Sequence, residues 1–142
     1  MNPHYTSQSL SIVIPIYNEE EILVDSGNQI LAICEKTKIS YEVILVENGS
    51  TDETKSIAYN FSKKNSFVRV MNLEDPNYGN ALKEGFLEAQ NDLVVSFDID
   101  YFSEFFLNEA LSLDKDFAAV IASKRMQDSR DDRRAIRKVA TK

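Results

Sequence analysis

Short, nearly continuous runs of aliphatic residues alternate along the chain with longer segments whose apolar residues recur every three or four positions. The short runs are typical of strands that are buried on both faces, and the longer segments are typical of amphipathic helices. We expect strands at residues 9–16, 41–46, 67–72, 93–97 and 118–123. The segments between them predict helices at residues 19–38, 50–64, 79–90 and 103–113.

Regular alternation of strands and helices predicts an α/β fold in which helices cover both faces of a mostly parallel sheet. Right-handed crossovers between parallel strands leave few topologies, and we expect a Rossmann-like core with the strand order 3-2-1-4. Ser50 and Glu53 have the spacing of a capping box that would open the second helix. We divide the chain into a polar N-terminal tail at residues 1–8, one domain at residues 9–123 and a basic segment at residues 124–142.

An apolar stripe of Ile136, Val139 and Ala140 predicts that the basic segment starts a further helix. This predicted helix stops at Lys142 without a C-cap glycine or a polar run-out. We therefore expect the chain to be part of a longer protein, and the basic segment to begin an acceptor-side or membrane-facing element.

Charge is divided unevenly between the domain and the basic segment. Eight basic and three acidic residues give residues 124–142 a net charge of +5, which leaves −12 on residues 1–123 of a chain whose total is −7. The acidic body argues against a nucleic acid as partner. Because arginine suits bidentate contact with phosphate, we expect Arg125, Arg133 and Arg134 to face an acceptor phosphate or an anionic membrane. A solvated helix face is the alternative interpretation of this segment.

Composition and the length of the apolar runs favour a soluble, cytoplasmic chain. No apolar run approaches the roughly 20 residues that cross a bilayer, and the N-terminus lacks the basic and apolar regions of a signal peptide.

The one cysteine, Cys34, lies in a predicted helix and is expected to fill the core. The one histidine, His4, precedes the first strand, so we expect no catalytic triad or metal site built on histidine. Contact with the cytoplasmic face of a membrane would come through the basic segment.

Three of the predicted strands end in polar, mostly acidic residues. The first is followed by Tyr-Asn-Glu-Glu at residues 17–20, the second ends in Glu-Asn-Gly-Ser-Thr-Asp at residues 47–52, and the fourth ends in Asp-Ile-Asp at residues 98–100. Ligands of open parallel sheets bind at the carboxyl ends of the strands, where the strand order reverses, so these acids should converge on one crevice. A carboxylate cluster usually needs a cation, and hard oxygen ligands suit Mg²⁺ or Mn²⁺. Taken alone, Asp-Ile-Asp is more often a polar strand exit.

Four motifs together resemble family 2 glycosyltransferases in their order and spacing. They are Ile-Pro-Ile-Tyr-Asn-Glu-Glu at residues 14–20, Val-Glu-Asn-Gly-Ser-Thr-Asp at 46–52, Asn-Tyr-Gly-Asn-Ala-Leu-Lys-Glu-Gly at 77–85 and Phe-Asp-Ile-Asp at 97–100. The chain is most similar to the branch that includes dolichyl- and polyprenyl-phosphate sugar transferases. The resemblance implies a GT-A fold, of which this chain would be the N-terminal, nucleotide-sugar-binding part.

The resemblance also implies roles for individual residues. It assigns Asp98 and Asp100 to the metal and to catalysis, and it places Gly79 and Ala81 in a turn close to the nucleotide. The residues it assigns to the nucleotide sugar are Pro15, Tyr17, Glu19, Glu47, Asn48, Gly79, Ala81, Lys83 and Asp98. Glu47-Asn48 stands where the family usually has Asp-Asp, which leaves the preferred base open.

Other interpretations apply to several of these polar residues. Tyr17 fits a packed aromatic side chain equally well, and Glu19 and Glu20 fit the first turn of a helix, where acids are favourable. For Ser50 and Asp52, helix capping is the preferred interpretation.

We therefore expect a metal-dependent, inverting glycosyltransferase that moves a sugar from a GDP- or UDP-linked donor to a polyprenyl or dolichyl phosphate. Such a phosphate is largely ionised at neutral pH, since its second pKa is about 6, and it needs little help from a general base. Two alternatives stay open. One is a truncated, non-catalytic nucleotide-sugar-binding module. The other is a magnesium-dependent phosphotransfer domain, whose usual aspartate after the first strand is replaced here by Asn18-Glu19.

Overall fold

The computed structural model describes residues 9–113, together with the backbone of residues 119–122 and 136–139. The strands in these ranges form one sheet in the order β3-β2-β1-β4-β5-β6. The first five strands run parallel, and the sixth pairs antiparallel with the fifth. The strands are β1 (Ser9–Ile16), β2 (Ser40–Asn48), β3 (Val68–Leu73), β4 (Leu93–Ser96), β5 (Ala119–Ala122) and β6 (Ile136–Val139). The predicted α/β class, parallel sheet and core order 3-2-1-4 are confirmed.

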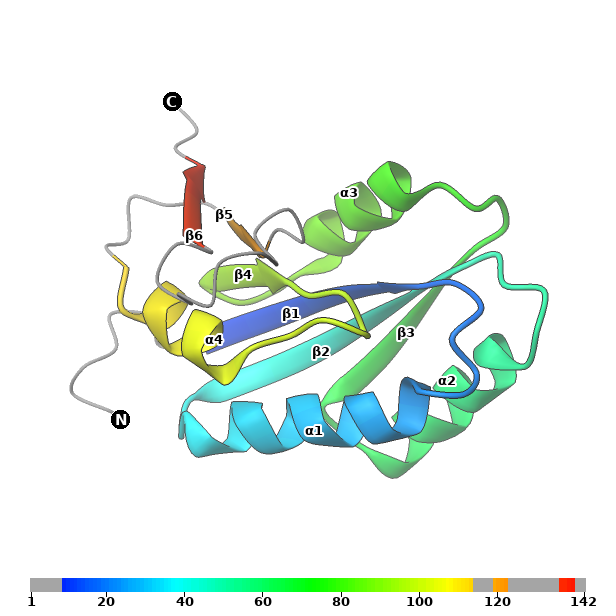
Figure 1. Cartoon of the computed structure of the whole chain (residues 1–142), viewed down its shortest axis with the longest axis horizontal. Helices are drawn as coiled ribbons and strands as arrows, with labels where there is room; N and C mark the ends of the chain where they lie inside the picture. The colour runs from blue at the N-terminus through cyan, green and yellow to red at the C-terminus, as the bar shows by residue number, and fades with distance from the viewer. Residues whose placement is uncertain (1–8, 114–118, 123–135, 140–142) are drawn as a thin grey trace.

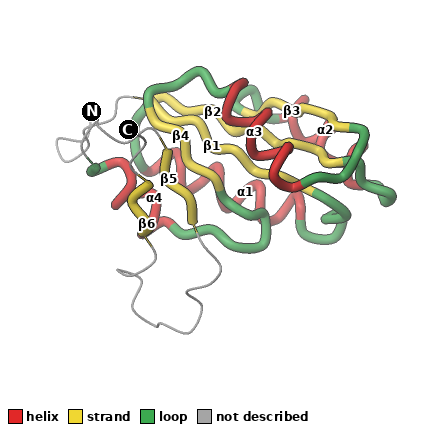
Figure 2. Tube along the Cα trace, turned by 90° about the horizontal axis from the view of Figure 1, so that it is seen from above, coloured by secondary structure: helices red, strands yellow, loops and turns green. Residues whose placement is uncertain are grey.

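Helices cover both faces of the sheet (Figures 1 and 2). They are α1 (Leu23–Lys36), α2 (Thr54–Lys64), α3 (Tyr78–Glu88) and α4 (Glu104–Leu111). Buried side chains of α1, α2 and α4 share the larger core cluster, while Ala81 of α3 belongs to a smaller cluster on the opposite face. None of these helices is long and apolar enough to span a membrane.

Alternation along β1 explains the two clusters. Leu10, Ile12, Ile14 and Ile16 are buried in the larger cluster, whereas Val13 is buried in the smaller one. Successive side chains of a strand point to opposite faces, so a strand covered on both sides is apolar almost throughout. The continuous apolar run that predicted this strand therefore reflects the helices on both of its faces.

Two helix starts differ from the prediction. Helix α1 begins at Leu23 rather than near Glu19, and residues 19–22 form turns in which the Glu19 carbonyl accepts from the N–H of Leu23 at 3.0 Å. The predicted capping box of Ser50 and Glu53 is wrong, because Glu53 at the N-cap of α2 makes no side-chain capping bond. Residues 18–20, before α1, instead hydrogen-bond to residues 50–54, before and at the start of α2.

The helix predicted for the end of the chain is also wrong where the structure describes it. Ile136–Val139 forms β6, which pairs with β5 and covers the edge that β5 would otherwise expose. Apolar residues three apart suit a helix, but so short a pattern cannot exclude a strand. Arg125, Arg133 and Arg134, with the tail at residues 1–8, lie outside the described residues.

Helix α3 approaches the sheet closely at Gly85. A Cβ atom at this position would overlap Val13 and would lie 3.0 Å from Val46 Cγ2. Gly79, in the same helix, has Asn77 Oδ1 at 3.6 Å as the nearest atom to such a Cβ. The two glycines thus form a matched pair: a Cβ at Gly85 would overlap the core, whereas a Cβ at the exposed Gly79 would make only an ordinary van der Waals contact.

We expect Gly85→Ala to lower the free energy of unfolding by about 1–3 kcal/mol, the usual cost of overpacking a core. Gly79→Ala should be neutral or stabilise slightly, because alanine favours a helix by roughly 1 kcal/mol over glycine. Urea unfolding followed by circular dichroism measures both. Equal stability of the two variants would contradict the packing of α3 described here.

Candidate functional site

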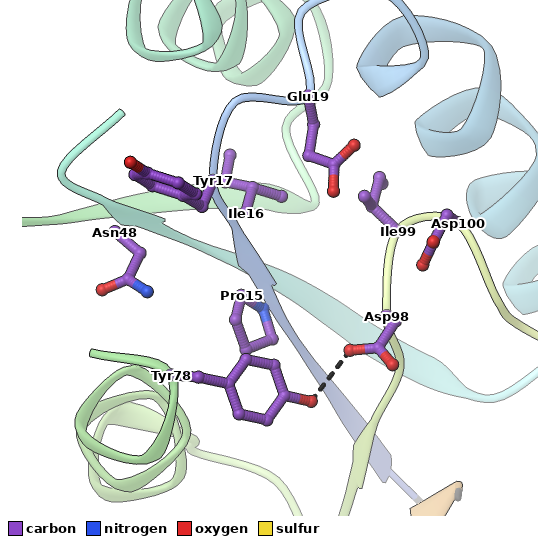
Figure 3. A pocket seen from close by; sticks show the side chains of 9 residues that line it. All are labelled: Pro15, Ile16, Tyr17, Glu19, Asn48, Tyr78, Asp98, Ile99 and Asp100. Atoms are coloured by element: carbon purple, nitrogen blue, oxygen red, sulfur yellow. Dashed lines mark hydrogen bonds between the residues drawn. The ribbon is translucent and has the colours of Figure 1, made fainter. Parts of the chain in front are cut away.

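A pocket with a cavity volume of about 240 Å³ opens at the carboxyl ends of β1, β2 and β4 (Figure 3). From β1 the chain continues first to β2 and β3 on one side of the sheet and then to β4 and β5 on the other side. Ligands of open parallel sheets bind at the carboxyl ends of the strands where the order reverses in this way. The lining residues are Pro15, Ile16, Tyr17, Glu19, Asn48, Tyr78, Asp98, Ile99 and Asp100. The structure thus brings six residues of the predicted site together: Pro15, Tyr17, Glu19, Asn48, Asp98 and Asp100.

Three carboxylates line this pocket from two loops. In Figure 3 the side chains of Glu19, Asp98 and Asp100 extend into the same space. Ile99, between the two aspartates, is only 1% exposed and packs in the larger core cluster. Burial of Ile99 leaves its two neighbours at the pocket, and a hydrogen bond of 3.1 Å from the Tyr101 N–H to the Asp98 carbonyl closes the turn. Carboxylates gathered in this way repel one another and an incoming diphosphate, which favours a bound cation.

The carboxylates of the pocket are the candidate ligands for the predicted Mg²⁺ or Mn²⁺. Among the residues that the structure describes, no group of three His, Cys, Asp or Glu side chains is arranged to hold a metal by itself. Mg²⁺ commonly takes one or two carboxylates and completes its shell with water and substrate phosphates. Asp98 and Asp100 supply the one or two carboxylates that such an ion takes from a protein.

The loop after β1 is locked to the loop after β2. Asn18 has a positive φ of 52°, its N–H donates to Ser50 Oγ at 3.0 Å, and its Oδ1 accepts from the Thr51 N–H at 2.8 Å. The Glu19 N–H donates to Thr54 Oγ1 at 2.7 Å. Asparagine tolerates the left-handed conformation better than most residues. The lock fixes the backbone on both sides of Asn18, and so it places Tyr17 and Glu19 at the pocket.

Acidic side chains complete the lock. Glu20 Oε2 accepts from the Glu53 N–H at 2.9 Å, and Asp52 Oδ1 accepts from the Thr54 N–H at 2.9 Å. Burial alone would raise the pKa of Asp52, but hydrogen bonds from Thr54 and from the Glu20 N–H lower it below its ordinary value. Asp52 thus caps the start of α2, as expected. Ser50 does not, because its hydroxyl serves Asn18.

Replacing Thr54 by valine removes the acceptor of the Glu19 N–H while keeping the shape of a side chain that is fully buried. We expect the free energy of unfolding to fall by about 1–3 kcal/mol, the cost of leaving a polar group without its partner. Thr51→Val is the control, because its hydroxyl makes only a 3.3 Å contact at an exposed position. Urea unfolding of both variants measures the difference, and a loss of similar size in the control would contradict the lock.

The two residues that end β2 have different surroundings. Glu47 is 2% exposed and its Oε1 accepts from the Ser50 N–H at 2.7 Å, so it holds the loop and does not line the pocket. Asn48 lines the pocket, and its Oδ1 accepts from the Asn77 N–H at 2.9 Å. The structure therefore brings one residue of this pair to the site.

The family resemblance implies a turn at Gly79 and Ala81, whereas the apolar periodicity predicts a helix from residue 79. The structure places both residues in the first turns of α3, so the helix is confirmed and the turn is wrong. Asn77 caps this helix, its Oδ1 accepting from the Asn80 N–H at 2.9 Å, so the helix begins before the two small residues. Ala81 is fully buried against the sheet, and Lys83 is exposed on the helix. Gly79, Ala81 and Lys83 do not line this pocket, and their predicted contact with the nucleotide stays a prediction.

Sequence reasoning missed Tyr78, the first residue of α3. Its hydroxyl donates to Asp98 Oδ1 at 2.8 Å (Figure 3). Partial burial, the hydrogen bond to Asp98 and the nearby negative charges raise the pKa of Tyr78 above its ordinary value. The phenol therefore remains protonated, and a donor, throughout the physiological pH range. Tyr78 belongs to the Asn-Tyr-Gly-Asn motif at residues 77–80, but its contact with Asp98 spans 20 positions and no local pattern records it.

Comparison with known proteins places the chain in a family. A family model described as glycosyl transferase family 2 matches residues 11–139. The chain is similar to an undecaprenyl-phosphate 4-deoxy-4-formamido-L-arabinose transferase of Enterobacter sp. (strain 638), with 38% identity over 93 residues, or 64% of this chain and 28% of the relative. An enzyme of the same name from Pseudomonas fluorescens is 35% identical over 98 residues, or 68% of this chain and 29% of the relative. The chain thus spans about three tenths of the length of these curated relatives.

Solved structures agree on the fold. A mannosyltransferase of Pyrobaculum calidifontis, solved in complex with GDP-Man and Mn²⁺, has a TM-score of 0.63 and 19% identity, covering 80% of this chain and 34% of that one. Residues 1–349 of S. aureus TarS give a TM-score of 0.58 and 24% identity, covering 72% and 31%. At this identity the likeness shows the fold alone, which is GT-A. Since the family model covers most of its length, the chain belongs to glycosyl transferase family 2.

Proposed function

We propose that this chain forms the donor-binding part of a glycosyltransferase that moves a sugar from a nucleoside diphosphate sugar to a polyprenyl phosphate. The observation that carries the proposal is the pocket that joins Tyr17, Asn48, Asp98 and Asp100 at the carboxyl ends of three parallel strands. Support for the acceptor comes from the names of the curated relatives, which are undecaprenyl-phosphate sugar transferases. The proposed donor is linked to GDP or UDP.

In the proposed site, four of the lining residues contact the nucleotide or the cation. Tyr17, 43% exposed at the pocket, offers an aromatic face to the base. Asn48 offers its amide group, whose Oδ1 already accepts from Asn77, so its Nδ2 is the donor for a ligand. Asp98 and Asp100 would hold Mg²⁺ or Mn²⁺, which when bound supplies positive charge for the departing diphosphate.

The acceptor phosphate brings its own negative charge, so the proposed transfer needs no strong base from the described pocket. We further propose that the anomeric carbon is inverted, as the sequence resemblance implies. Arg125, Arg133 and Arg134 would contact the acceptor phosphate or the cytoplasmic face of a membrane, where arginine's fork suits bidentate contact.

Transfer of label to lipid tests the proposal. The chain is incubated with radiolabelled UDP- or GDP-linked sugars, undecaprenyl phosphate and Mn²⁺, and the product is extracted into organic solvent. We expect labelled lipid whose amount falls when EDTA is added. Because the chain spans about three tenths of its relatives' length, donor binding without transfer would instead favour a non-catalytic binding module. Absence of both donor binding and transfer would contradict the proposed function.

A further inference from the structure

Two successive residues at the start of α3 connect the ends of two strands that are not neighbours. The Asn77 N–H donates to Asn48 Oδ1 at the end of β2, at 2.9 Å. The Tyr78 hydroxyl donates to Asp98 Oδ1 just after β4, at 2.8 Å. Strand β1 lies between these two strands in the sheet, and Pro15 of β1 lines the same pocket as Tyr78 (Figure 3). The start of α3 therefore spans the pocket from one side to the other.

The fold has little need of the Tyr78 hydroxyl. Tyr78 is 52% exposed, so its ring adds little to the core. Helix α3 is held to the sheet by Ala81 and Gly85, which are buried, and its first turn is capped by Asn77. A phenol that contributes little to folding, yet donates to an acid of the pocket, is better explained by the pocket.

We propose that Tyr78 is a positioning residue, whose hydroxyl holds the Asp98 carboxylate in the orientation that receives a divalent cation together with a nucleoside diphosphate. This inference rests on the proposed function, since it concerns the cation of the same site.

Three physical arguments support a positioning role. An aspartate in a loop loses side-chain freedom when it binds an ion, and a hydrogen bond formed beforehand reduces that loss. An ionised carboxylate has about four lone-pair sites, so a hydrogen bond from one hydroxyl does not by itself exclude a cation. Carboxylates that bind metals are commonly held by such donors, and removing the donor typically lowers metal affinity by about 10- to 100-fold.

The opposite arrangement would reverse the sign of the effect. If the hydroxyl competed with the cation for Asp98 Oδ1, its removal would free the carboxylate and tighten metal binding. Tyr78→Phe separates the two arrangements because it keeps the ring and removes only the donor. Tyr59→Phe is the matched control, since Tyr59 is an exposed tyrosine of α2 that does not line the pocket.

The test measures Mn²⁺ binding through the electron paramagnetic resonance signal of the free ion, with saturating UDP and, in parallel, GDP. We expect Tyr78→Phe to weaken Mn²⁺ binding by about 10-fold or more, while Tyr59→Phe binds like the unmodified chain. We expect the unmodified chain and both variants to have the same thermal unfolding midpoint. If the Tyr78 hydroxyl were needed for folding, Tyr78→Phe would have a lower midpoint.

Equal or tighter Mn²⁺ binding by Tyr78→Phe, with normal binding by the unmodified chain, would overturn the positioning role and leave the proposed function intact. A lowered unfolding midpoint that accompanies the weaker binding would overturn it as well, in favour of a structural role. Failure of the unmodified chain to bind Mn²⁺ with either nucleotide would overturn both this inference and the proposed function.

Discussion

Replacing Asp98 or Asp100 by alanine should weaken Mn²⁺-dependent binding of a nucleoside diphosphate by more than about 100-fold. Even outer partners of a metal site cost roughly 10- to 100-fold, and these two side chains are the proposed ligands themselves. Without the cation, Glu19 and the remaining aspartate of the pocket would repel the diphosphate. Calorimetric titration of UDP and GDP, with Mn²⁺ present, measures the loss.

The control for this loss is Asp92→Ala. Asp92 is exposed and directly precedes β4, so it lies at the opposite end of the strand from the pocket. It should bind nucleotide like the unmodified chain. Neither pocket variant should be less stable to urea, because each removes one of several like charges. Unchanged nucleotide affinity in Asp100→Ala would count against the proposed metal ligands.

The second large effect is expected at Gly49, where the chain turns between β2 and α2. Its φ of +74° lies in the left-handed region, and a Cβ atom there would lie 2.6 Å from the Glu74 carbonyl oxygen. The conformation costs a non-glycine residue about 1–2 kcal/mol, and overpacking adds about 1–3 kcal/mol. We expect Gly49→Ala to lower the free energy of unfolding by about 2–5 kcal/mol, as measured by urea denaturation.

A second substitution at the same position separates the two causes. Asparagine tolerates a positive φ better than alanine, but its Cβ would meet the same carbonyl oxygen. Gly49→Asn should therefore be less destabilised than Gly49→Ala and still clearly less stable than the unmodified chain. A loss below about 1 kcal/mol in Gly49→Ala would contradict this turn, and with it the placement of Asn48, its neighbour.

The first five strands and the core order 3-2-1-4 could be predicted, because the alternation of strands and helices extends over most of the chain. The strand predicted at residues 9–16 has the bounds of β1, since burial on both faces makes most of its positions apolar. The pocket followed from topology, because parallel strands bring their carboxyl ends to one edge. Asp98 and Asp100 could therefore be placed near Asn48 without any contact being known.

The rest depends on contacts that no local pattern records. A local pattern favours a helix from Glu19, but α1 begins at Leu23. The Glu19 N–H instead donates to Thr54, 35 positions away, and no local pattern shows such a bond. Glu47 belongs to an acidic run like the proposed ligands, but a single bond to Ser50 and burial take it out of the pocket. Tyr78 reaches Asp98 across 20 positions, so its part in the site became visible only in three dimensions.

One measurement tests the central claim, which is that a cation binds at Asp98 and Asp100 together with a nucleotide. Mn²⁺ broadens the amide signals of nearby residues in nuclear magnetic resonance spectra, whereas Mg²⁺ does not. With UDP or GDP present, replacing Mg²⁺ by Mn²⁺ should broaden the signals of Asp98, Ile99 and Asp100 most strongly. Broadening centred on Asp52 and Glu53, in the loop between β2 and α2, would contradict the account if the signals of Asp98, Ile99 and Asp100 were unaffected.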